Sequence, residues 1–375
     1  MKKYIILAAA ALAALASCTK IETDAPENTG NAINFKAVNY KAQTTKAAGP
    51  IAGTTYKTTD PIFGVFGFYL PGTKTWAANK ADAQDFMGTA SAALPVSYLS
   101  AKSTWGTADT YFWPFTGSVS FAAYTPYYAN AAATGETGTA ITASFDKTNG
   151  ITFTDFSPAT AAADQVDLMY SAVVADQVDN TEAGATGNES AYKGVPIVFN
   201  HALSQIQFNV GLAEEYGNGF EMTIKKLSVA LYNEGDFTAK DGWTLPTSIS
   251  AASDTTQYTP IASSAFPYQL VYGDQGKLTS LTPMLVIPQA PLSKIVITYT
   301  LKSNANAPVL EDTIELNISE AADFKLVAGK KYVYDITFGP RVIYFAPHIA
   351  TDWDDASNTI TTTYTVPATS NSNNG

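Results

Sequence analysis

Residues 195–210 read VPIVFNHALSQIQFNV, and this stretch decides how the chain divides its apolar side chains. In the first half, Ile197, Phe199 and His201 fall on one face of a strand, because side chains alternate with a period of two. In the second half, Ile206, Phe208 and Val210 take the opposite phase, so the buried face changes. A strand of this kind passes between two cores, and we therefore place a domain boundary near residue 195.

Short alternating segments separated by turn residues lie on both sides of this stretch. The 21 Tyr, 19 Phe, 25 Gly and 19 Pro favour β-structure. No stretch longer than two turns has helical periodicity. We therefore expect an all-β protein of two sandwiches with about seven strands each, in residues 31–194 and 195–375. In the second sandwich, strands are predicted at residues 222–232, 281–288, 294–301, 313–318 and 331–338.

The first sandwich has fewer clear strands. Residues 60–72 carry apolar side chains on both faces, which is typical of a strand that is covered on both sides. Residues 111–117 and 119–126 predict two short strands, and Pro114 and Pro126 place them at sheet edges or strand ends. Residues 74–102 and 127–163 show little periodicity and are predicted to be loops.

Composition and charge exclude some classes of function. The chain has 375 residues, of which 46% are hydrophobic and 15% charged, so it has ample material for folded cores. Its net charge of −11 argues against a nucleic-acid partner, because such binding needs a basic face. The positive charge is nearly all Lys, and Arg341 is the only Arg.

The N-terminus predicts export as a lipoprotein. Lys2 and Lys3 precede an apolar run at residues 4–16, which is too short to span a bilayer. The run leads to Cys18, the only cysteine, in a sequence that resembles the lipobox of bacterial lipoproteins. Residues 1–17 are then the signal peptide and residues 18–30 an acidic linker, and acyl chains on Cys18 hold the protein at a membrane. The alternative is an ordinary signal peptide with an incidental cysteine.

Residues 31–50, NAINFKAVNYKAQTTKAAGP, predict a strand at 31–42 and a polar loop at 43–50. Ile33, Phe35 and Ala37 share one face, and the phase slips at Ala37–Val38 as at a bulge. An edge strand joined to the body by a Lys-containing loop can be released by a trypsin-like protease. Lys46 and Ala47 are the residues on either side of the expected cut. The alternative is that Lys46 is an ordinary loop residue.

The C-terminus offers an extended segment at residues 358–367. Ile360, Thr362, Tyr364 and Val366 alternate with Thr neighbours, and β-propensity is high throughout. This segment is the best candidate for a strand donated to another subunit. The alternative is that it forms the last strand of its own sandwich. Residues 370–375 are expected to be a disordered tip.

Several of these segments together resemble the fimbrillin-like proteins of Bacteroidales, the type V pilins. The resemblance rests on motifs scattered in order over most of the mature chain: the lipobox at 15–18, residues 33–35 with 45–47, YFWP at 111–114, FAAYTP at 121–126, DLMY at 167–170, FNHALS at 199–204, LVIPQ at 285–289 and AGKKYVYDITF at 328–338.

The family implies two transthyretin-like Greek-key β-sandwich domains in tandem and a structural rather than enzymatic role. It also implies export to the outer membrane as a lipoprotein, and removal of the N-terminal strand by a trypsin-like protease. The groove left behind then receives a strand from another copy or a related pilin. Family members usually carry Arg at the cut, whereas this chain has Lys46. A Lys-cutting protease therefore acts here, or the chain stays uncut as an anchor.

Catalytic and metal-binding signals are weak. His201 and His348 are the only histidines, and no Gly-x-Ser-x-Gly elbow or phosphate loop is present. We interpret His201 as a hydrogen-bonded structural residue near the domain boundary. Residues 352–355 and 233–236 contain carboxylates without EF-hand spacing, and we interpret them as solvated turns. No catalytic residue, metal ligand or cofactor is predicted.

The leading hypothesis is therefore a pilin subunit of a surface fimbria that supports adhesion to host or bacterial ligands. The alternative is a surface-anchored lipoprotein that binds glycans or host ligands, as a fimbrial tip adhesin or an unpolymerised anchor. Exposed aromatic rings can stack on sugars. Trp76 and Trp105 lie in regions predicted to be loops and are the candidates for such a platform.

Overall fold

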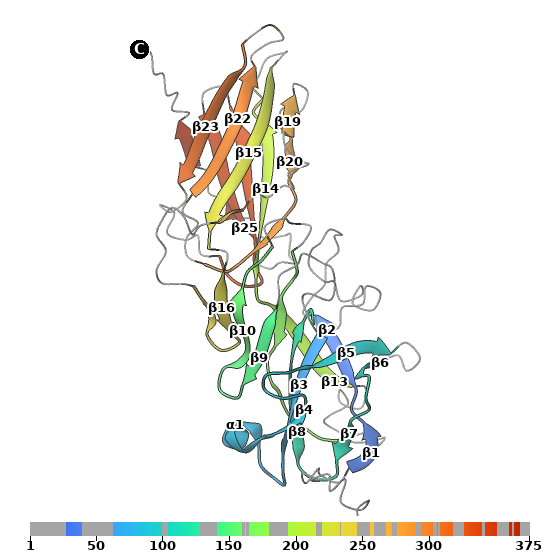
Figure 1. Cartoon of the computed structure of the whole chain (residues 1–375). Coiled ribbons are helices and arrows are strands. Elements are labelled where there is room, and N and C mark those ends of the chain that lie inside the picture. Colours follow the sequence, from blue (N-terminus) through green and yellow to red (C-terminus); the bar gives the residue numbers. More distant parts are fainter. Residues whose placement is uncertain are drawn as a thin grey trace, which may run out of the picture.

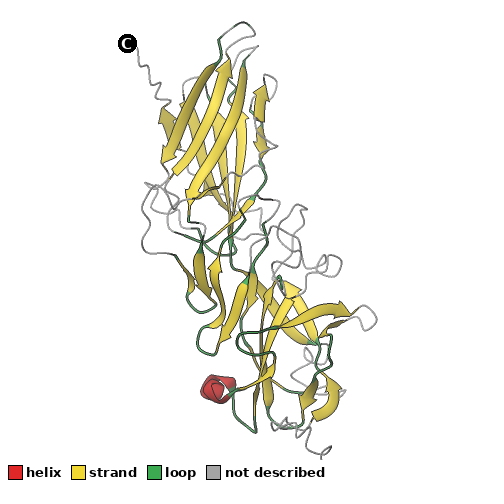
Figure 2. Cartoon of the chain, in the orientation of Figure 1, coloured by secondary structure: helices red, strands yellow, loops and turns green. Residues whose placement is uncertain are grey.

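The protein is described by a computed structural model, in which nearly every element is a strand (Figures 1 and 2). The all-β prediction is therefore confirmed. Among the described residues, the helical elements are the adjacent short α1 (Trp76–Asn79) and η2 (Lys80–Asp82), and Ala162 is also in a 3-10 conformation. The structure describes residues 28–39, 63–99, 104–127, 141–159, 162, 165–179, 194–214, 220–232, 234–245, 256–258, 268–271, 276–289, 294–302, 306, 308–317, 326–339, 342–350, 360–361 and 364–367.

Seven strands of the first half of the chain form a closed ring in the order β3-β8-β11-β13-β2-β6-β5, with β5 pairing back to β3. Such a ring is a β-sandwich whose two sheets are joined along their edges. Two further strands extend it, β4 on β3 and β12 on β8. The bounds are β2 (Phe35–Asn39), β3 (Phe63–Leu70), β4 (Gln84–Met87), β5 (Leu94–Leu99), β6 (Thr104–Thr107), β8 (Ser118–Thr125), β11 (Met169–Ser171), β12 (Val174–Gln177) and β13 (Val195–His201).

Two hydrophobic clusters cover the two faces of this ring. One cluster, the ring core, receives side chains from all seven strands and therefore lies inside. The other, the outer cluster, lies against the outside of β3 and β8. Along β3, Phe63 and Val65 enter the ring core while Phe66 and Phe68 enter the outer cluster. Every residue of β3 and β8 is consequently buried, as predicted for residues 60–72.

A sheet of four strands contributes to the outer cluster and draws on both halves of the chain. It has the order β17-β16-β10-β9, and the rings of Phe153 on β10 and Phe237 on β16 stack with centroids 5.5 Å apart. In Figure 1 these strands lie between the ring and the upper strands. The bounds are β9 (Thr142–Asp146), β10 (Gly150–Phe156), β16 (Gly235–Thr238) and β17 (Gly242–Thr244).

The second half of the chain contains two sheets that enclose a third cluster. One sheet is built on β14, β24 and β25, and the other on β15, β22 and β23. The strands of the first are β14 (Ser204–Leu212), β20 (Leu278–Ser280), β21 (Met284–Val286), β24 (Lys331–Phe338), β25 (Val342–Ala350), β26 (Ile360–Thr361) and β27 (Tyr364–Pro367). Those of the second are β15 (Glu221–Leu231), β18 (Thr256–Tyr258), β19 (Tyr268–Val271), β22 (Lys294–Lys302) and β23 (Leu310–Asn317).

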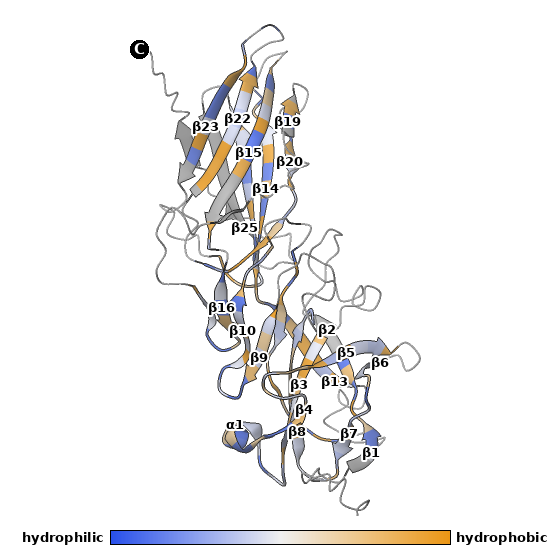
Figure 3. Ribbon diagram, in the orientation of Figure 1, coloured by the Kyte–Doolittle hydropathy of each residue, from blue (hydrophilic) through white to orange (hydrophobic). Residues whose placement is uncertain are grey.

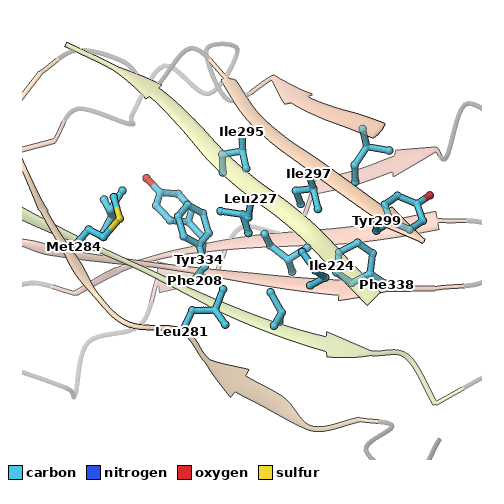
Figure 4. Close-up of a cluster of buried hydrophobic side chains, with 14 of the residues drawn as sticks. Phe208, Ile224, Leu227, Leu281, Met284, Ile295, Ile297, Tyr299, Tyr334 and Phe338 are labelled. Carbon is cyan, nitrogen blue, oxygen red and sulfur yellow. The ribbon is translucent and has the colours of Figure 1, made fainter. Parts of the chain in front are cut away.

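Alternating burial marks this second sandwich. On β24, Tyr332, Tyr334, Ile336 and Phe338 are buried and their neighbours are half-buried. β14 likewise alternates between hydrophilic and hydrophobic residues (Figure 3). Figure 4 shows these side chains meeting between the two sheets, where the rings of Phe208 and Tyr334 stack with centroids 5.3 Å apart.

The predicted change of phase within residues 195–210 is present. Ile197 and Phe199 on β13 belong to the ring core, whereas Ile206, Phe208 and Val210 on β14 belong to the second sandwich. The two strands are separated by Ala202 and Leu203, which are fully buried in the outer cluster. The chain thus passes from one core to the other where the pattern indicated. The division into domains at residue 195 stays a prediction.

Two of the predicted loops are wrong. Residues 74–102 contain α1, η2, β4 and β5, and residues 127–163 contain β9 and β10. These elements are short, and their position depends on distant partners. The ring of Trp76 lies 5.9 Å from that of Phe68 and 6.0 Å from that of Phe145. Such contacts stabilise elements that have little local periodicity.

Candidate functional site

The N-terminal segment of the described chain forms two strands rather than one. β1 (Asn28–Ala32) pairs antiparallel with β7 (Phe112–Pro114), and β2 begins at Phe35. The break falls at Ile33 and Asn34, and the backbone N–H of Ile33 donates to the carbonyl oxygen of Tyr111 at 2.7 Å. We call residues 28–39 the lid segment.

The prediction that this segment is an edge strand is wrong. β2 lies between β13, to which it is parallel, and β6, to which it is antiparallel. The predicted bulge at Ala37–Val38 is also wrong, because the register between β2 and β13 is unbroken from Phe35 to Asn39. The alternation had indicated a strand but not its neighbours. Residues 40–42, the end of the predicted strand, lie outside the described residues.

Ile33 and Phe35, two of the three predicted core-facing residues, are both buried in the ring core. The Phe35 ring packs edge-on against Phe63 at 6.0 Å and Phe121 at 5.4 Å between centroids. Aromatic side chains in such a geometry contribute more than their buried area alone. The lid segment is therefore part of the core it covers. The third predicted residue, Ala37, pairs through its backbone with Ile197.

Backbone contacts tie the lid segment to several neighbours. The N–H of Val195 donates to the carbonyl oxygen of Asn34 at 2.8 Å. The hydroxyl of Thr104 donates to the carbonyl oxygen of Phe35 at 3.3 Å. The side-chain amide of Asn31 donates to the Asp179 carboxylate at 2.9 Å. These bonds join the lid segment to β13, to β6 and to the chain after β12.

Gly194 permits the close approach of β2 to β13. Its φ is +102°, in the region that favours glycine. A Cβ at this position would lie 2.7 Å from the carbonyl carbon of Phe35 and 2.8 Å from its oxygen. The contact is with backbone, which cannot rotate away. Sequence reasoning missed this residue, although a glycine directly before a predicted strand is a signal of close backbone approach.

The two sides of β2 are held unequally. Among the residues that the structure describes, five pairs join β2 to β13, whereas only the pair Phe35 and Trp105 joins it to β6. Beside this single pair lies a cavity of about 430 Å³. Its lining comes from the lid segment, the end of β5, the end of β6 and the chain after β6: Ala32, Ile33, Asn34, Tyr98, Leu99, Gly106, Thr107, Ala108, Asp109 and Thr110.

The C-terminal segment pairs with its own sandwich on one side. β27 pairs antiparallel with the first part of β25, and β26 with its second part. On its other side β25 pairs with β24, so β26 and β27 form an edge of this sheet in the described part of the chain. This is the arrangement of the alternative reading, a last strand of its own domain. Ile360, Tyr364 and Val366 are placed by their backbones, and Thr362 lies outside the described residues.

The residues predicted for lipidation and cleavage, Cys18, Lys46 and Ala47, also lie outside the described residues. His201 is hydrogen-bonded as predicted, with Nδ1 2.9 Å from the Asp167 carboxylate oxygen and both side chains largely buried. His348 is placed on β25 by its backbone.

The predicted aromatic platform is absent. Trp76 is 8% exposed and Trp105 is 5% exposed, because each belongs to a hydrophobic cluster. Trp105 instead lies on β6 opposite the lid segment, a role that sequence reasoning missed. Within the described ranges, no group of three His, Cys, Asp or Glu side chains could hold a metal ion. In that part of the chain no helix is long and apolar enough to cross a membrane.

Comparisons with known proteins agree on one group. A sequence model described as fimbrillin-like matches residues 19–353. A fimbrial protein from Bacteroides vulgatus shares the fold, with a TM-score of 0.61 and 19% identity over 86% of this chain and 99% of that one. A candidate cell adhesion protein from Bacteroides uniformis gives a TM-score of 0.49 and 14% identity over 87% of this chain and 100% of that one. No curated protein sequence matches the chain.

Proposed function

Because the chain belongs to the fimbrillin-like family, we propose that it is a structural pilin which polymerises by exchange of its lid segment. In this proposal the protein is exported as a lipoprotein anchored through Cys18 in the outer membrane. A trypsin-like protease then cuts between Lys46 and Ala47. The residues before the cut leave, and a strand from another copy or a related pilin takes the place of β2. The resulting fimbria supports adhesion.

The observation that carries this proposal is the position of β2. It completes a ring that would otherwise be open between β13 and β6, and it supplies Phe35 to the ring core. Its loss would leave unpaired backbone groups on β13 and β6 and bare apolar surface beneath. Both favour capture of a replacement strand, by main-chain hydrogen bonds and by the hydrophobic effect.

Residues 358–367 are the proposed replacement. They have high β-propensity, and their apolar residues alternate as a strand covering a core requires. In the described part of their own sandwich, β26 and β27 pair on one side only. A strand that pairs on one side leaves its sheet by breaking a single ladder of hydrogen bonds. The segment therefore suits donation to a second copy.

Cleavage and assembly can be tested together. The purified chain is incubated with a Lys-specific trypsin-like protease, and products are followed by size-exclusion chromatography, electron microscopy and mass spectrometry. We expect a new N-terminus at Ala47 and the appearance of polymers. Lys46→Gln should prevent both. Lys36→Gln is the matched control and should leave cleavage and polymers unchanged. Lys36 lies within β2, where strand pairing should protect its peptide bond from the protease.

Clean cleavage at Lys46 that leaves only monomers would contradict the proposal. In cells, the N-terminus of the surface protein provides a second test. Ala47 is expected for a polymerised subunit, whereas acylated Cys18 as the sole N-terminus would show that the lid segment is retained.

A further inference from the structure

β6 has a largely open edge beside the lid segment. On one side, all four of its residues pair with β5, but on the other only Trp105 pairs with β2. Continuing the antiparallel register would place Asn34 opposite Gly106 and Ile33 opposite Thr107. The lid segment instead turns toward β7, so the ladder ends after one residue pair.

The cavity of about 430 Å³ occupies the place where this ladder would continue. Its lining includes residues 32–34 of the lid segment and residues 106–110, which face each other across the missing pairs. The lining is mixed in character. Ile33 and Leu99 are apolar, whereas Asn34, Thr107, Asp109 and Thr110 carry polar groups.

The lid segment cannot leave alone without exposing the ring core. Ile33 and Phe35 are buried, and the edge-on contacts of Phe35 with Phe63 and Phe121 would be lost. Exposure of this apolar surface opposes spontaneous departure even after the backbone has been cut. A strand that enters before the lid leaves would offset this cost as each contact is replaced.

We propose that this cavity is the invasion site, at which the C-terminal segment of a second copy pairs with the open edge of β6 while β2 still pairs with β13. The incoming strand then displaces β2 from the β6 side toward the β13 side. This inference rests on the proposed strand exchange and adds the place and the order of its steps.

Tyr364 is the side chain that fits the cavity. Residues 358–366 are uncharged, and Tyr364 is their only aromatic residue. A tyrosine has an apolar body and a polar tip, which match the Ile33 and Leu99 surfaces and the polar rim. The Asp109 carboxylate supplies an acceptor for the phenolic hydroxyl. Val366 and Ile360 lack such a tip.

The order of steps can be measured from the rate of lid release. The full chain carries Lys20→Gln, which removes the lysine between the label and the lid segment, and is made without lipid. It is labelled with a fluorophore at Cys18, its only cysteine, and is cut at Lys46. At nanomolar protein concentration, an excess of a synthetic peptide of residues 356–370 is added. Release of the labelled fragment is followed by fluorescence anisotropy. We expect a rate that rises in proportion to the peptide concentration.

Variants locate the site. A Tyr364→Ala peptide should lower the slope at least tenfold, and a Tyr364→Phe peptide should lower it less. In the protein, Ala108→Trp or Thr110→Trp fills the cavity from exposed positions and should lower the slope at least tenfold. Ala77→Trp, exposed on α1 and outside the cavity lining, is the control and should leave the slope unchanged. Thermal unfolding verifies that each variant is folded.

Release at a rate independent of peptide concentration, followed by peptide binding, would overturn the invasion site but not strand exchange. An unchanged slope in both cavity-filling variants would do the same. If the peptide never occupies the groove, even after the fragment has been removed in denaturant and the protein refolded, the proposed function fails as well.

Discussion

The two ends of the chain are held in different ways. At the N-terminal end, β2 lies between two strands, and Phe35 on it is 1% exposed inside the ring core. At the C-terminal end, the described pairings of β26 and β27 are with β25 alone, at an edge of their sheet. The lid segment is thus part of a core, whereas the described backbone of the C-terminal segment is paired at a sheet edge.

This difference matters for exchange between copies. An edge strand can leave its sheet at the cost of one ladder of hydrogen bonds, each with a modest net contribution. A strand that closes a ring cannot leave without uncovering apolar surface. The proposed exchange therefore moves the C-terminal segment, which is held by one ladder of hydrogen bonds, into the groove that β2 leaves open. Four predictions test this comparison.

Phe35→Ala should have the largest effect. Truncation of a fully buried phenylalanine costs about 3–5 kcal/mol through lost burial and the cavity left behind. Urea unfolding of the uncut chain measures it. Lys36→Ala, an exposed neighbour on the same strand, should change the free energy of unfolding by less than about 0.5 kcal/mol. Equal effects of the two variants would show that β2 is not part of the core.

Gly194→Ala should come next, at about 2–4 kcal/mol. The residue has a positive φ, and the new Cβ would press on the Phe35 backbone. Gly242→Ala is the matched control, because Gly242 has φ +80° and nothing within 4 Å of the Cβ position. The control should lose about 1 kcal/mol from backbone strain alone. If both variants lose the same amount, close packing of β2 on β13 is not what Gly194 provides.

Deletion of residues 358–375 should lower the free energy of unfolding by about 1–2 kcal/mol, because a ladder of backbone hydrogen bonds at a sheet edge is lost. The same deletion should abolish polymers of the cleaved protein. Tyr364→Asp should also block elongation. A folded deletion variant that still polymerises would transfer the donor role to another segment.

Alkaline pH should have the smallest effect. Burial, followed by the nearby Asp312 carboxylate, raises the pKa of Tyr299 to about 12 in the second sandwich. The folded state therefore prefers the neutral phenol. This contribution is complete below pH 10, the ordinary pKa, and is lost as the pH rises from 10 to 12. Raising the pH to 10.5 should lower the free energy of unfolding less in Tyr299→Phe than in the parent protein. The difference between the two losses should be under about 1 kcal/mol once screening by water is allowed for. Equal pH profiles would contradict this.

Strand character was predictable wherever alternation was strong. The phase change across residues 195–210, the two buried faces of β3 and the alternation of β24 all follow from side-chain period alone. The short elements α1 and β9 were not predictable, because rings far apart in the chain hold them in place: Phe145 on β9 contacts Phe68 on β3 and Trp76 on α1. For the same reason Trp76 and Trp105 were misplaced on the surface.

The sequence by itself determined that this chain is β-structured, that it builds more than one core, and that Ile33 and Phe35 point inward. Only the tertiary structure decided that β2 has neighbours on both sides, that Gly194 lies against it, and that its pairing with β6 stops after one residue. The physical reason is that side-chain period is a local property, whereas strand pairing joins residues far apart in the chain. Phe35 meets Trp105 and Ile197 lies beside Ala37 only after the ring has closed.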